Sequence, residues 1–265
     1  MADLAGSFGS VADAYERGRP RYEAHVIDVI GEAAGGPRIL DVGAGTGRLS
    51  GPLLAAGYDV VAVEPLDAMR AILAGHIGAE RALDGRAEAL PLADASVDGA
   101  VCSDAWHWFD GARAADELAR VVRPGGGVVI CISLSGEEDR EADPPWAQEL
   151  NRLWDELTAA VDHPYVHGSR RPDGLEGHTA FEEMQVRNVP FVHHTDRERI
   201  VAHFASMSFV SSLPDDRRAE VLAEIDAVLG RHAIERVDVP YRAELWITRR
   251  RRDPAPPAGR AEAAS

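Results

Sequence analysis

Residues 39–49 read ILDVGAGTGRL, an apolar run followed by glycines at positions 43, 45 and 47. The run predicts a short buried strand. The glycines predict a tight turn whose backbone can take positive φ and approach a ligand without a Cβ clash. In an open α/β sheet, ligands lie beyond the carboxyl ends of the strands. We therefore expect a binding site at this turn.

The spacing of the glycines narrows the choice of nucleotide. The dinucleotide fingerprint needs a glycine three positions after the second, where this chain has Arg48, and the phosphate-binding P-loop needs a lysine, which the sequence lacks. Glu64 ends the next predicted strand, where its carboxylate can accept hydrogen bonds from both hydroxyls of a ribose. An adenosyl compound without a pyrophosphate is therefore the predicted ligand, and a nicotinamide oxidoreductase is disfavoured.

Strand and helix patterns alternate through the first half of the chain. We expect strands at residues 38–42, 59–64, 81–86, 97–103 and 127–133, and helices at 21–34, 47–56, 66–75 and 112–122. Near-continuous apolar strands separated by helices predict an α/β fold with a parallel, doubly wound sheet and helices on both faces.

The second half is less regular. Its patterns predict helices at residues 146–161, 196–208 and 215–231, and strands at 184–193 and 239–248. Residues 1–20 are small and polar and predict a loosely packed lead-in. Composition predicts a disordered tail at 251–265.

Charge and cysteine content limit the partners and the compartment. The chain has 44 acidic and 28 basic residues and a net charge of -16, which disfavours nucleic acid and membrane surfaces as partners. The N-terminus lacks the pattern of a signal peptide, and no apolar run reaches the ~20 residues that span a bilayer. The two cysteines, Cys102 and Cys131, each lie in an apolar stretch, which predicts buried thiols and a cytoplasmic location.

Four ordered motifs carry a family resemblance. LDVGAGTG, VVAVEP, AEALPLADASVDGAV and ELARVVRPGGGVVI resemble the motifs of class I S-adenosylmethionine-dependent methyltransferases over roughly residues 10–133. YRAELWITRR resembles the closing strand of that fold. The resemblance implies a Rossmann-like sheet of seven strands, the last antiparallel, and S-adenosylmethionine as cofactor. It also implies a core at 21–133 and 184–250, with helical substrate-cap insertions at 134–183 and 196–236.

The resemblance also implies contacts to the cofactor. It places the methionine moiety near Asp41, Gly43 and Gly45 in the turn that Gly47 completes, and it places the ribose on Glu64. It places the adenine near Pro65, Ala87 and Glu88. Many relatives carry an acid where this chain has Arg86, so the contact to the adenine amino group is expected from Glu88 or from backbone. The lead-in YERGRP resembles the segment that folds over the cofactor, and its candidate contacts are Tyr15 and Arg19.

The acceptor side is predicted from CSDAWHWFD, which follows the strand at 97–103. Its side chains are expected to face the cleft, with Asp104 toward the cofactor and Trp106 and Trp108 toward the substrate. Core packing is the alternative for both tryptophans. His107 is the candidate catalytic base, with a structural histidine as the alternative. An aromatic past this strand also occurs in trans-aconitate methyltransferase and in the carrier-bound malonyl methyltransferase of biotin synthesis, which esterify carboxylates.

The cap insertions supply further candidates for the acceptor. An apolar lining is expected from Trp146, Trp154, Tyr165, Phe181, Phe204, Met207 and Phe209, and Arg170 and Arg171 are candidates to clamp a carboxylate. No metal site is expected, because Pro164 disfavours a helix that would join His163 and His167.

We therefore predict transfer of a methyl group to a carboxylate or hydroxyl oxygen of a small molecule. Transfer to carbon or nitrogen, as in the ubiquinone and menaquinone methyltransferases, stays open, because the AEALPLADASVDGAV motif resembles those enzymes equally well. A cofactor-binding partner protein without catalysis also stays open, as does the oligomeric state.

Overall fold

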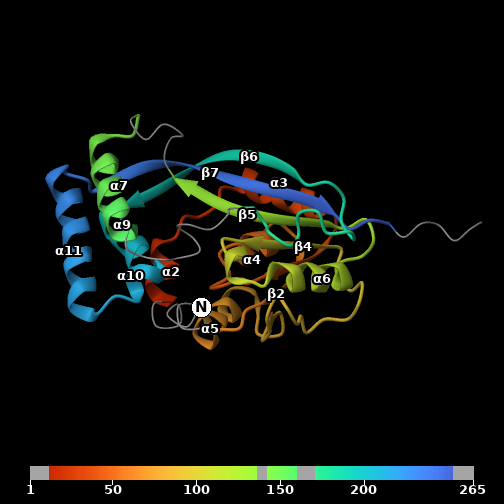
Figure 1. The fold of residues 1–265 in the computed structure, drawn as a ribbon. Coiled ribbons are helices and arrows are strands. Elements are labelled where there is room, and N and C mark those ends of the chain that lie inside the picture. Colours follow the sequence, from red (N-terminus) through yellow and green to blue (C-terminus); the bar gives the residue numbers. More distant parts are fainter. Residues whose placement is uncertain (1–11, 136–141, 160–170, 253–265) are drawn as a thin grey trace, which may run out of the picture.

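A computed structural model describes residues 12–135, 142–159 and 171–252. The chain forms a seven-stranded sheet with the order β3-β2-β1-β4-β5-β7-β6. Figure 1 shows the fold, with helices packed against this sheet. Strand β7 pairs antiparallel with β5 and β6, and the other pairs are parallel. The predicted Rossmann-like, mostly parallel α/β sheet is therefore confirmed. Its strands are β1 (Arg38–Val42), β2 (Asp59–Val63), β3 (Ala82–Leu83), β4 (Gly99–Ser103), β5 (Gly127–Ser135), β6 (Gln185–Asp196) and β7 (Arg236–Arg249).

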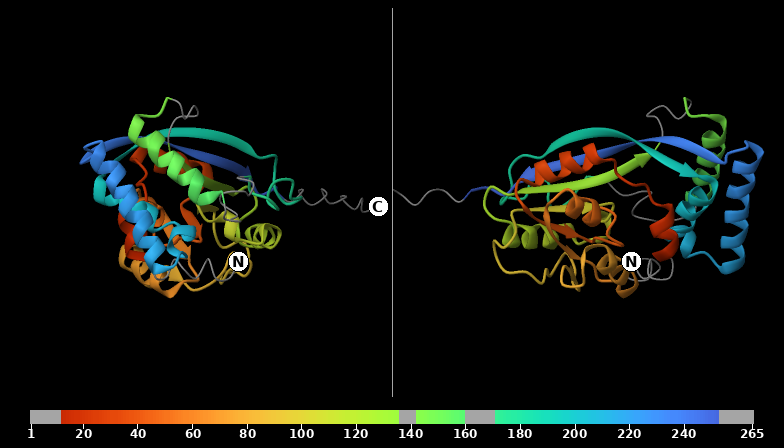
Figure 2. Two further views of the ribbon diagram at one scale, coloured as in Figure 1. Left: turned by 60° about the vertical axis from the view of Figure 1, so that its left-hand side comes forward. Right: turned by 180° about the vertical axis from the view of Figure 1, so that it is seen from behind.

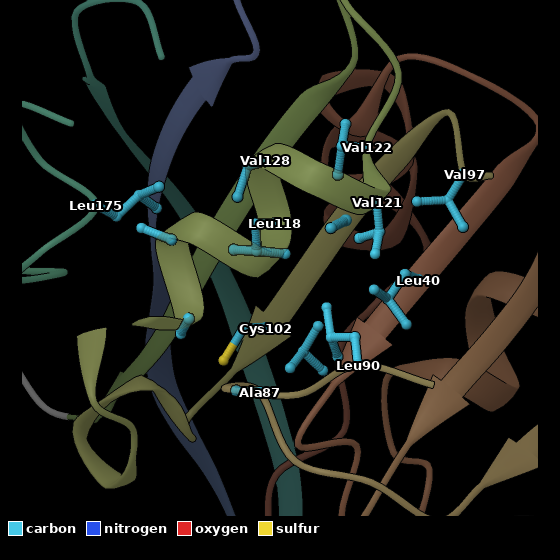
Figure 3. Close-up of a cluster of buried hydrophobic side chains, with 14 of the residues drawn as sticks. Leu40, Ala87, Leu90, Val97, Cys102, Leu118, Val121, Val122, Val128 and Leu175 are labelled. Carbon is cyan, nitrogen blue, oxygen red and sulfur yellow. The ribbon is translucent and has the colours of Figure 1, made fainter. Parts of the chain in front are cut away.

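Helices cover both faces of the sheet, as expected. On one face, α3 (Ala24–Ala34) and α4 (Ser50–Ala55) pack on residues such as Ile39 and Val129, and α5 (Asp67–Ile77) packs beside them. On the other face lies α6 (Gly111–Val121), whose Leu118 packs among β-strand residues that include Cys102 (Figure 3). Both cysteines are buried free thiols, which confirms their interpretation.

The lead-in is more ordered than the sequence suggests. Residues Ala12–Gly18 form helix α2, so the expectation of a loosely packed segment is wrong for this part, while residues 1–11 lie outside the described residues. Gly18 lies against the backbone of α9 (Arg197–Ala205), and a Cβ on Gly18 would be 2.1 Å from the amide nitrogen of His203. The helix depends on this long-range contact, which the sequence pattern does not show.

The last two strands run longer than predicted. They pair with each other from Gln185 opposite Ile247 to Asp196 opposite Arg236, past the end of β5. Buried and exposed residues alternate along β6 from Val189 onward, as on an edge strand with one face against the protein. Their far end reaches the helices described next.

Four helices gather at one end of the sheet and share a hydrophobic cluster of their own (Figures 1 and 2). The predicted helix at 215–231 is found as α11, whereas the predicted helix at 196–208 ends at Ala205, because Met207 has an extended backbone and a separate short helix follows. These helices are α7 (Pro145–Thr158), α9, α10 (Ser208–Ser211) and α11 (Asp215–Arg231).

Residues 171–183, expected within the first cap insertion, pack instead on the core beside α6. Leu175 and Phe181 are 1% and 2% exposed and belong to the cluster that contains Leu118. Figure 3 shows Leu175 beside this helix. Phe181 therefore lies in the core and does not line the cap.

Candidate active site

The glycine turn has the backbone that its sequence predicts. Gly43, Gly45 and Gly47 have φ values of 67°, 57° and 90°, and the last of these explains why α4 begins at Ser50 and not at residue 47. The amide of Gly43 donates to the carbonyl of Val63 at 2.9 Å, which fixes the turn to the end of β2. A Cβ on Gly43 would lie 2.9 Å from the side chains of Ala105 and Phe109, so the turn has no space for one.

Glu64 stands at the end of β2, facing the turn. Its two carboxylate oxygens accept the amide protons of Gly45 and Leu66, each at 2.9 Å. Burial raises the pKa of Glu64, which is 5% exposed, while the two amide donors oppose that increase. A carboxylate has about four lone-pair sites, so Glu64 can still accept two further hydrogen bonds.

Asp41 lies behind the turn at the end of β1. Its Oδ2 accepts a hydrogen bond from the Ser50 hydroxyl at 2.5 Å, while Oδ1 is buried without a partner among the described residues. Burial raises the pKa of Asp41 to about 7, with a smaller contribution from the charge of Glu64. This orphaned oxygen is the unsatisfied polar atom at the turn.

Arg48 ties the lead-in to the turn. Its guanidinium donates to the carbonyl oxygens of Glu16 at 2.8 Å, of Pro20 at 2.7 Å, and of Arg19. The hydroxyl of Thr46 donates to the Glu16 carboxylate at 2.6 Å. The segment that follows α2 is therefore held directly over the glycines.

Tyr15 and Arg19 are thereby brought to the cavity wall. The guanidinium carbon of Arg19 lies 5.0 Å from the centre of the Tyr15 ring, and its Nε donates to the Ser206 hydroxyl at 3.2 Å. The Tyr15 ring also lies 3.7 Å from where a Cβ on Gly45 would be. The two residues predicted to cover the cofactor thus stand beside the turn.

Asp104 follows β4 in a strained conformation. Its φ is 52°, in the left-handed region, and its Oδ1 accepts the amide proton of Ser133 at 2.9 Å. Burial raises the pKa of this carboxyl, against the effect of the Ser133 amide. The Tyr22 hydroxyl lies 2.8 Å from the hydroxyl of Ser103 and 2.7 Å from that of Ser133, so one tyrosine joins the ends of β4 and β5.

The motif after Asp104 forms a short 3-10 helix, Trp106–Trp108, which directs its aromatic side chains partly to the cavity and partly to the core. His107 and Trp108 line the cavity, with ring centres 4.9 Å apart. Trp106 is 8% exposed in the core, and its indole nitrogen donates to the carbonyl of Asp173 at 3.2 Å. Trp106 therefore packs in the core, which was the alternative to a role in substrate binding.

A cavity of about 530 Å³ joins these groups to the helices at the end of the sheet. This volume lies in the range of small-molecule sites, ~300–1,000 Å³. One end is lined by the glycine turn, Glu64 and the lead-in. The other end is lined by the aromatic and apolar side chains of Trp146, Trp154, Phe204, Met207 and Phe209, as the sequence predicts.

Known proteins resemble this chain in sequence. Residues 40–130 match a family model described as a methyltransferase domain. An uncharacterised methyltransferase of Mycobacterium tuberculosis is 35% identical over 230 residues, which cover 87% of this chain and 88% of that protein. The malonyl-acyl-carrier-protein O-methyltransferase of Pectobacterium atrosepticum is 30% identical over 204 residues, which cover 76% of this chain and 72% of the relative.

A solved structure agrees. A provisionally assigned type II methyltransferase from Anaeromyxobacter dehalogenans superposes with a TM-score of 0.68 at 26% identity, covering 89% of this chain and 99% of that one. The chain belongs to the class I S-adenosylmethionine-dependent methyltransferases. Its cofactor is therefore S-adenosylmethionine, and the lysine-free glycine turn separates it from the P-loop and dinucleotide folds.

The turn of this methyltransferase fits the cofactor. Gly43 and Gly45 leave backbone exposed on the cavity, and Glu64 keeps acceptor capacity for the two ribose hydroxyls. Asp41, whose Oδ1 is buried without a partner among the described residues, lies behind the turn and not on the cavity lining. The turn also lacks the lysine with which a P-loop binds phosphate groups.

The predicted cofactor residues fall into two groups. Tyr15, Arg19, Gly43, Gly45, Glu64, Pro65 and Asp104 line the cavity, and so does Arg86. The others stand behind its wall. Gly47 lies against Leu73 of α5, Ala87 is a core residue, and Glu88 accepts the amide proton of Asp110 at 2.8 Å.

Several predicted acceptor residues lie elsewhere. Arg171 bonds to Glu176 at 2.6 Å and stands over the ring of Trp246, away from the cavity. Arg170, Tyr165 and the paired histidines at 163 and 167 fall outside the described residues. Within the described ranges, no group of three or more His, Cys, Asp or Glu side chains could hold a metal ion, and no helix is long and apolar enough to cross a membrane.

Three polar residues that line the cavity were not predicted from the sequence. His193 and Thr195 of β6 and His203 of α9 all line the cavity. The alternation of β6 contains a usable signal, because Val189, Phe191, His193 and Thr195 occupy every second position and all are buried. Polar residues that continue the core-facing positions of a strand indicate a functional site.

Proposed function

We propose that this methyltransferase transfers a methyl group to a carboxylate or hydroxyl oxygen of a small molecule. The single observation that carries the proposal is one cavity that runs from the glycine turn and Glu64 to the aromatic side chains of α7, α9 and α10. A cofactor at the turn and an acceptor against the aromatics would share that space. The helices at the end of the sheet would then act as a substrate cap. The relative named as an O-methyltransferase supports oxygen as the methylated atom.

S-adenosylmethionine supplies an activated methyl group when bound, so the chain's own residues mainly need to position the reactants. We assign the ribose to Glu64, the adenine side to Pro65, and the methionine moiety to the backbone of Gly43 and Gly45. Tyr15 and Arg19 cover it from the lead-in, where Arg48 holds them. Arg19 is the cation in reach of a cofactor carboxylate.

Acceptor positioning falls to the residues after β4 and to the cap. Holding an acceptor in line and excluding water supplies much of the rate enhancement in such transfers. Trp108 and the cap aromatics exclude water from the cavity. His107 is the candidate that accepts a proton when the acceptor is a hydroxyl, and a carboxylate acceptor needs no such base.

Calorimetric titration of S-adenosylhomocysteine tests the cofactor end, with NADH as a parallel ligand. We expect S-adenosylhomocysteine alone to bind. In Glu64→Gln its affinity falls by ~1–3 kcal/mol, the scale of losing hydrogen bonds to a charged group, while the exposed control Glu224→Gln binds as wild type. Unchanged affinity in Glu64→Gln overturns the ribose assignment, and binding of NADH overturns the function.

Transfer from the methyl-labelled cofactor tests the acceptor end. A panel of carboxylic acids, alcohols, phenols, amines and activated carbon acids is scored for labelled product. Base-labile product is an ester and base-stable product is an ether, an amine or a carbon adduct. Label confined to nitrogen or carbon acceptors contradicts the proposal. The His107→Ala variant, assayed on the best hydroxyl acceptor, should lose ~100-fold in turnover with cofactor affinity intact.

A further inference from the structure

Unpartnered polar atoms gather on the acceptor side of the cavity. Buried side-chain atoms nearly always have a hydrogen-bond partner, and leaving one without costs ~1–3 kcal/mol. In the described part of the chain, Thr195 Oγ1 and His203 Nδ1 are buried without any partner, and both residues line the cavity. A fold keeps such atoms at a cost in stability, and a bound ligand would offset that cost.

The two residues are brought together by consecutive elements. Thr195 stands near the end of β6, and His203 lies on α9, which begins directly after that strand. Thr195 is only 7% exposed, and its side chain continues the buried face of β6. The backbone of His203 is held in turn by Gly18 of α2, which packs against its amide. Both residues therefore line the same cavity as the glycine turn.

Thr195, His193 and His203 carry no positive charge. Burial lowers the pKa of His203 well below its usual value, and the nearby Arg19 adds to the effect. Burial likewise lowers the pKa of His193 to about 4, so both imidazoles are neutral at neutral pH. Thr195 is uncharged at every pH of interest.

The charged residues around the acceptor end are acids. Among the described cavity-lining residues of α7, β6, α9, α10 and β7 and the loops between them, the charged ones are Asp143 and Asp238, and no arginine is present. Two arginines line the cavity. Arg86 belongs to the loop after β3, whereas Arg19 of the lead-in reaches the end of α9, where its Nε donates to the Ser206 hydroxyl at 3.2 Å. Among the described residues, an acceptor carboxylate there would face Asp143 and Asp238, and the cavity-lining cation nearest to His203, Arg19, is already bonded to Ser206.

We propose that Thr195 and His203 form a subsite that hydrogen-bonds an uncharged hydroxyl of the acceptor, and that the acceptor is an apolar or aromatic alcohol and not a carboxylic acid. The inference deepens the proposed function and rests on it. The ring of Trp154 forms edge-to-face contacts with Phe204 and with Phe209, and these three side chains offer an apolar surface for the body of such a molecule. The hydroxyl of the acceptor would supply the missing hydrogen-bond partner of Thr195 Oγ1 and of His203 Nδ1.

The test is calorimetric binding of 2-naphthol and 2-naphthoate, matched probes that at neutral pH differ in charge, to the protein saturated with S-adenosylhomocysteine. We expect 2-naphthol to bind more tightly than 2-naphthoate. The variants Thr195→Val and His203→Leu should each weaken 2-naphthol binding by about 5-fold or more, the effect of one lost hydrogen bond, and leave S-adenosylhomocysteine affinity unchanged.

Thermal unfolding separates a ligand subsite from a structural role. Because Thr195 Oγ1 has no partner among the described residues, Thr195→Val should melt at or above the wild-type temperature. The matched control is Thr248→Val. The Thr248 hydroxyl donates to the Glu182 carbonyl at 2.8 Å and lies off the cavity, so this variant should melt lower and bind 2-naphthol normally.

Tighter binding of 2-naphthoate, no binding of 2-naphthol, or wild-type binding by both cavity variants overturns the subsite. Each of these results leaves the proposed function standing as long as S-adenosylhomocysteine binds. Failure of the wild-type protein to bind S-adenosylhomocysteine is the separate result that overturns the function itself.

Discussion

The two ends of the cavity differ in how their polar groups are satisfied. At the glycine turn, both oxygens of Glu64 accept backbone amides, and the amide of Gly43 is bonded to β2. At the cap, Thr195 Oγ1 and His203 Nδ1 are buried and unpartnered within the described chain. The comparison shows that, apart from Asp41 Oδ1, the polar groups named at the turn are bonded within the protein, whereas the proposed acceptor subsite has two atoms that a ligand would have to bond.

The two ends also differ in how far apart their residues lie in sequence. The turn and Glu64 come from one strand–helix–strand unit, residues 38–64, and their bonds are local. The acceptor end combines the loop after β4 with α7 and with the consecutive elements β6 and α9, which together extend from residue 104 to residue 205. Changes at the first end should therefore act on cofactor binding, and changes at the second should act on acceptor binding alone.

The largest expected effect is at the turn itself. Gly43→Ala places a Cβ 2.9 Å from Ala105 and Phe109 at a φ of 67°, so the loop must move. We expect S-adenosylhomocysteine affinity to fall roughly 100-fold, about 3 kcal/mol, by calorimetry. Gly57→Ala is the control, because Gly57 also has positive φ but has open space around it. A wild-type affinity of Gly43→Ala for S-adenosylhomocysteine would contradict the claim that the cofactor binds against this turn.

Asp41 is an exception at the turn, because its Oδ1 is buried and has no hydrogen-bond partner among the described residues. Burial raises its pKa to about 7 in the fold, so the unfolded chain ionises first and wild-type stability falls as pH rises from about 4 toward 7. Asp41→Asn lacks this titration. Chemical unfolding of both proteins across this range should show the wild type losing roughly 2–3 kcal/mol relative to the variant. A pH-independent difference would contradict the assignment.

Arg48 tests whether the lead-in belongs to the cofactor end. Arg48→Ala removes the donors to three carbonyl groups of residues 16–20, so Tyr15 and Arg19 lose their support. We expect S-adenosylhomocysteine affinity to fall about 10–30-fold, and Arg48→Lys to recover little, because an ammonium cannot replace the guanidinium fork. Arg217→Ala, on the exposed face of α11, is the control. Wild-type affinity in Arg48→Ala would mean that the lead-in does not contribute to cofactor binding.

The smallest effect is expected at the cap. Trp154→Leu removes a ring that packs edge-on against Phe209 with centres 4.9 Å apart and lines the cavity. Affinity for 2-naphthol should fall about 3–5-fold, near 1 kcal/mol, with S-adenosylhomocysteine unaffected. Trp246→Leu, which lies off the cavity, should change neither affinity. A loss of cofactor affinity in Trp154→Leu would mean that the two ends are coupled.

The parts of the fold that could be predicted have local causes. The strands β1 and β2 read as apolar runs because both faces are buried, and α11 was placed at its observed bounds by its helical periodicity. The glycine turn was predicted because glycine takes positive φ without strain, here at the three alternate positions 43, 45 and 47. Helix α2 could not be predicted, because its seven residues are too short to be stable without the contact to α9.

For the candidate site, the sequence by itself determined the cofactor end. The glycines and Glu64 predict where it lies because they belong to one strand–helix–strand unit, although the predicted contacts Gly47, Ala87 and Glu88 lie behind the cavity wall. Only the tertiary structure decided the rest. It placed Trp106 in the core and Trp108 at the cavity, let Arg48 bind the lead-in, and brought Thr195 and His203 to the same cavity. The physical reason is that a side chain's surroundings depend on which distant segments pack around it, and the sequence pattern near a residue does not specify those segments.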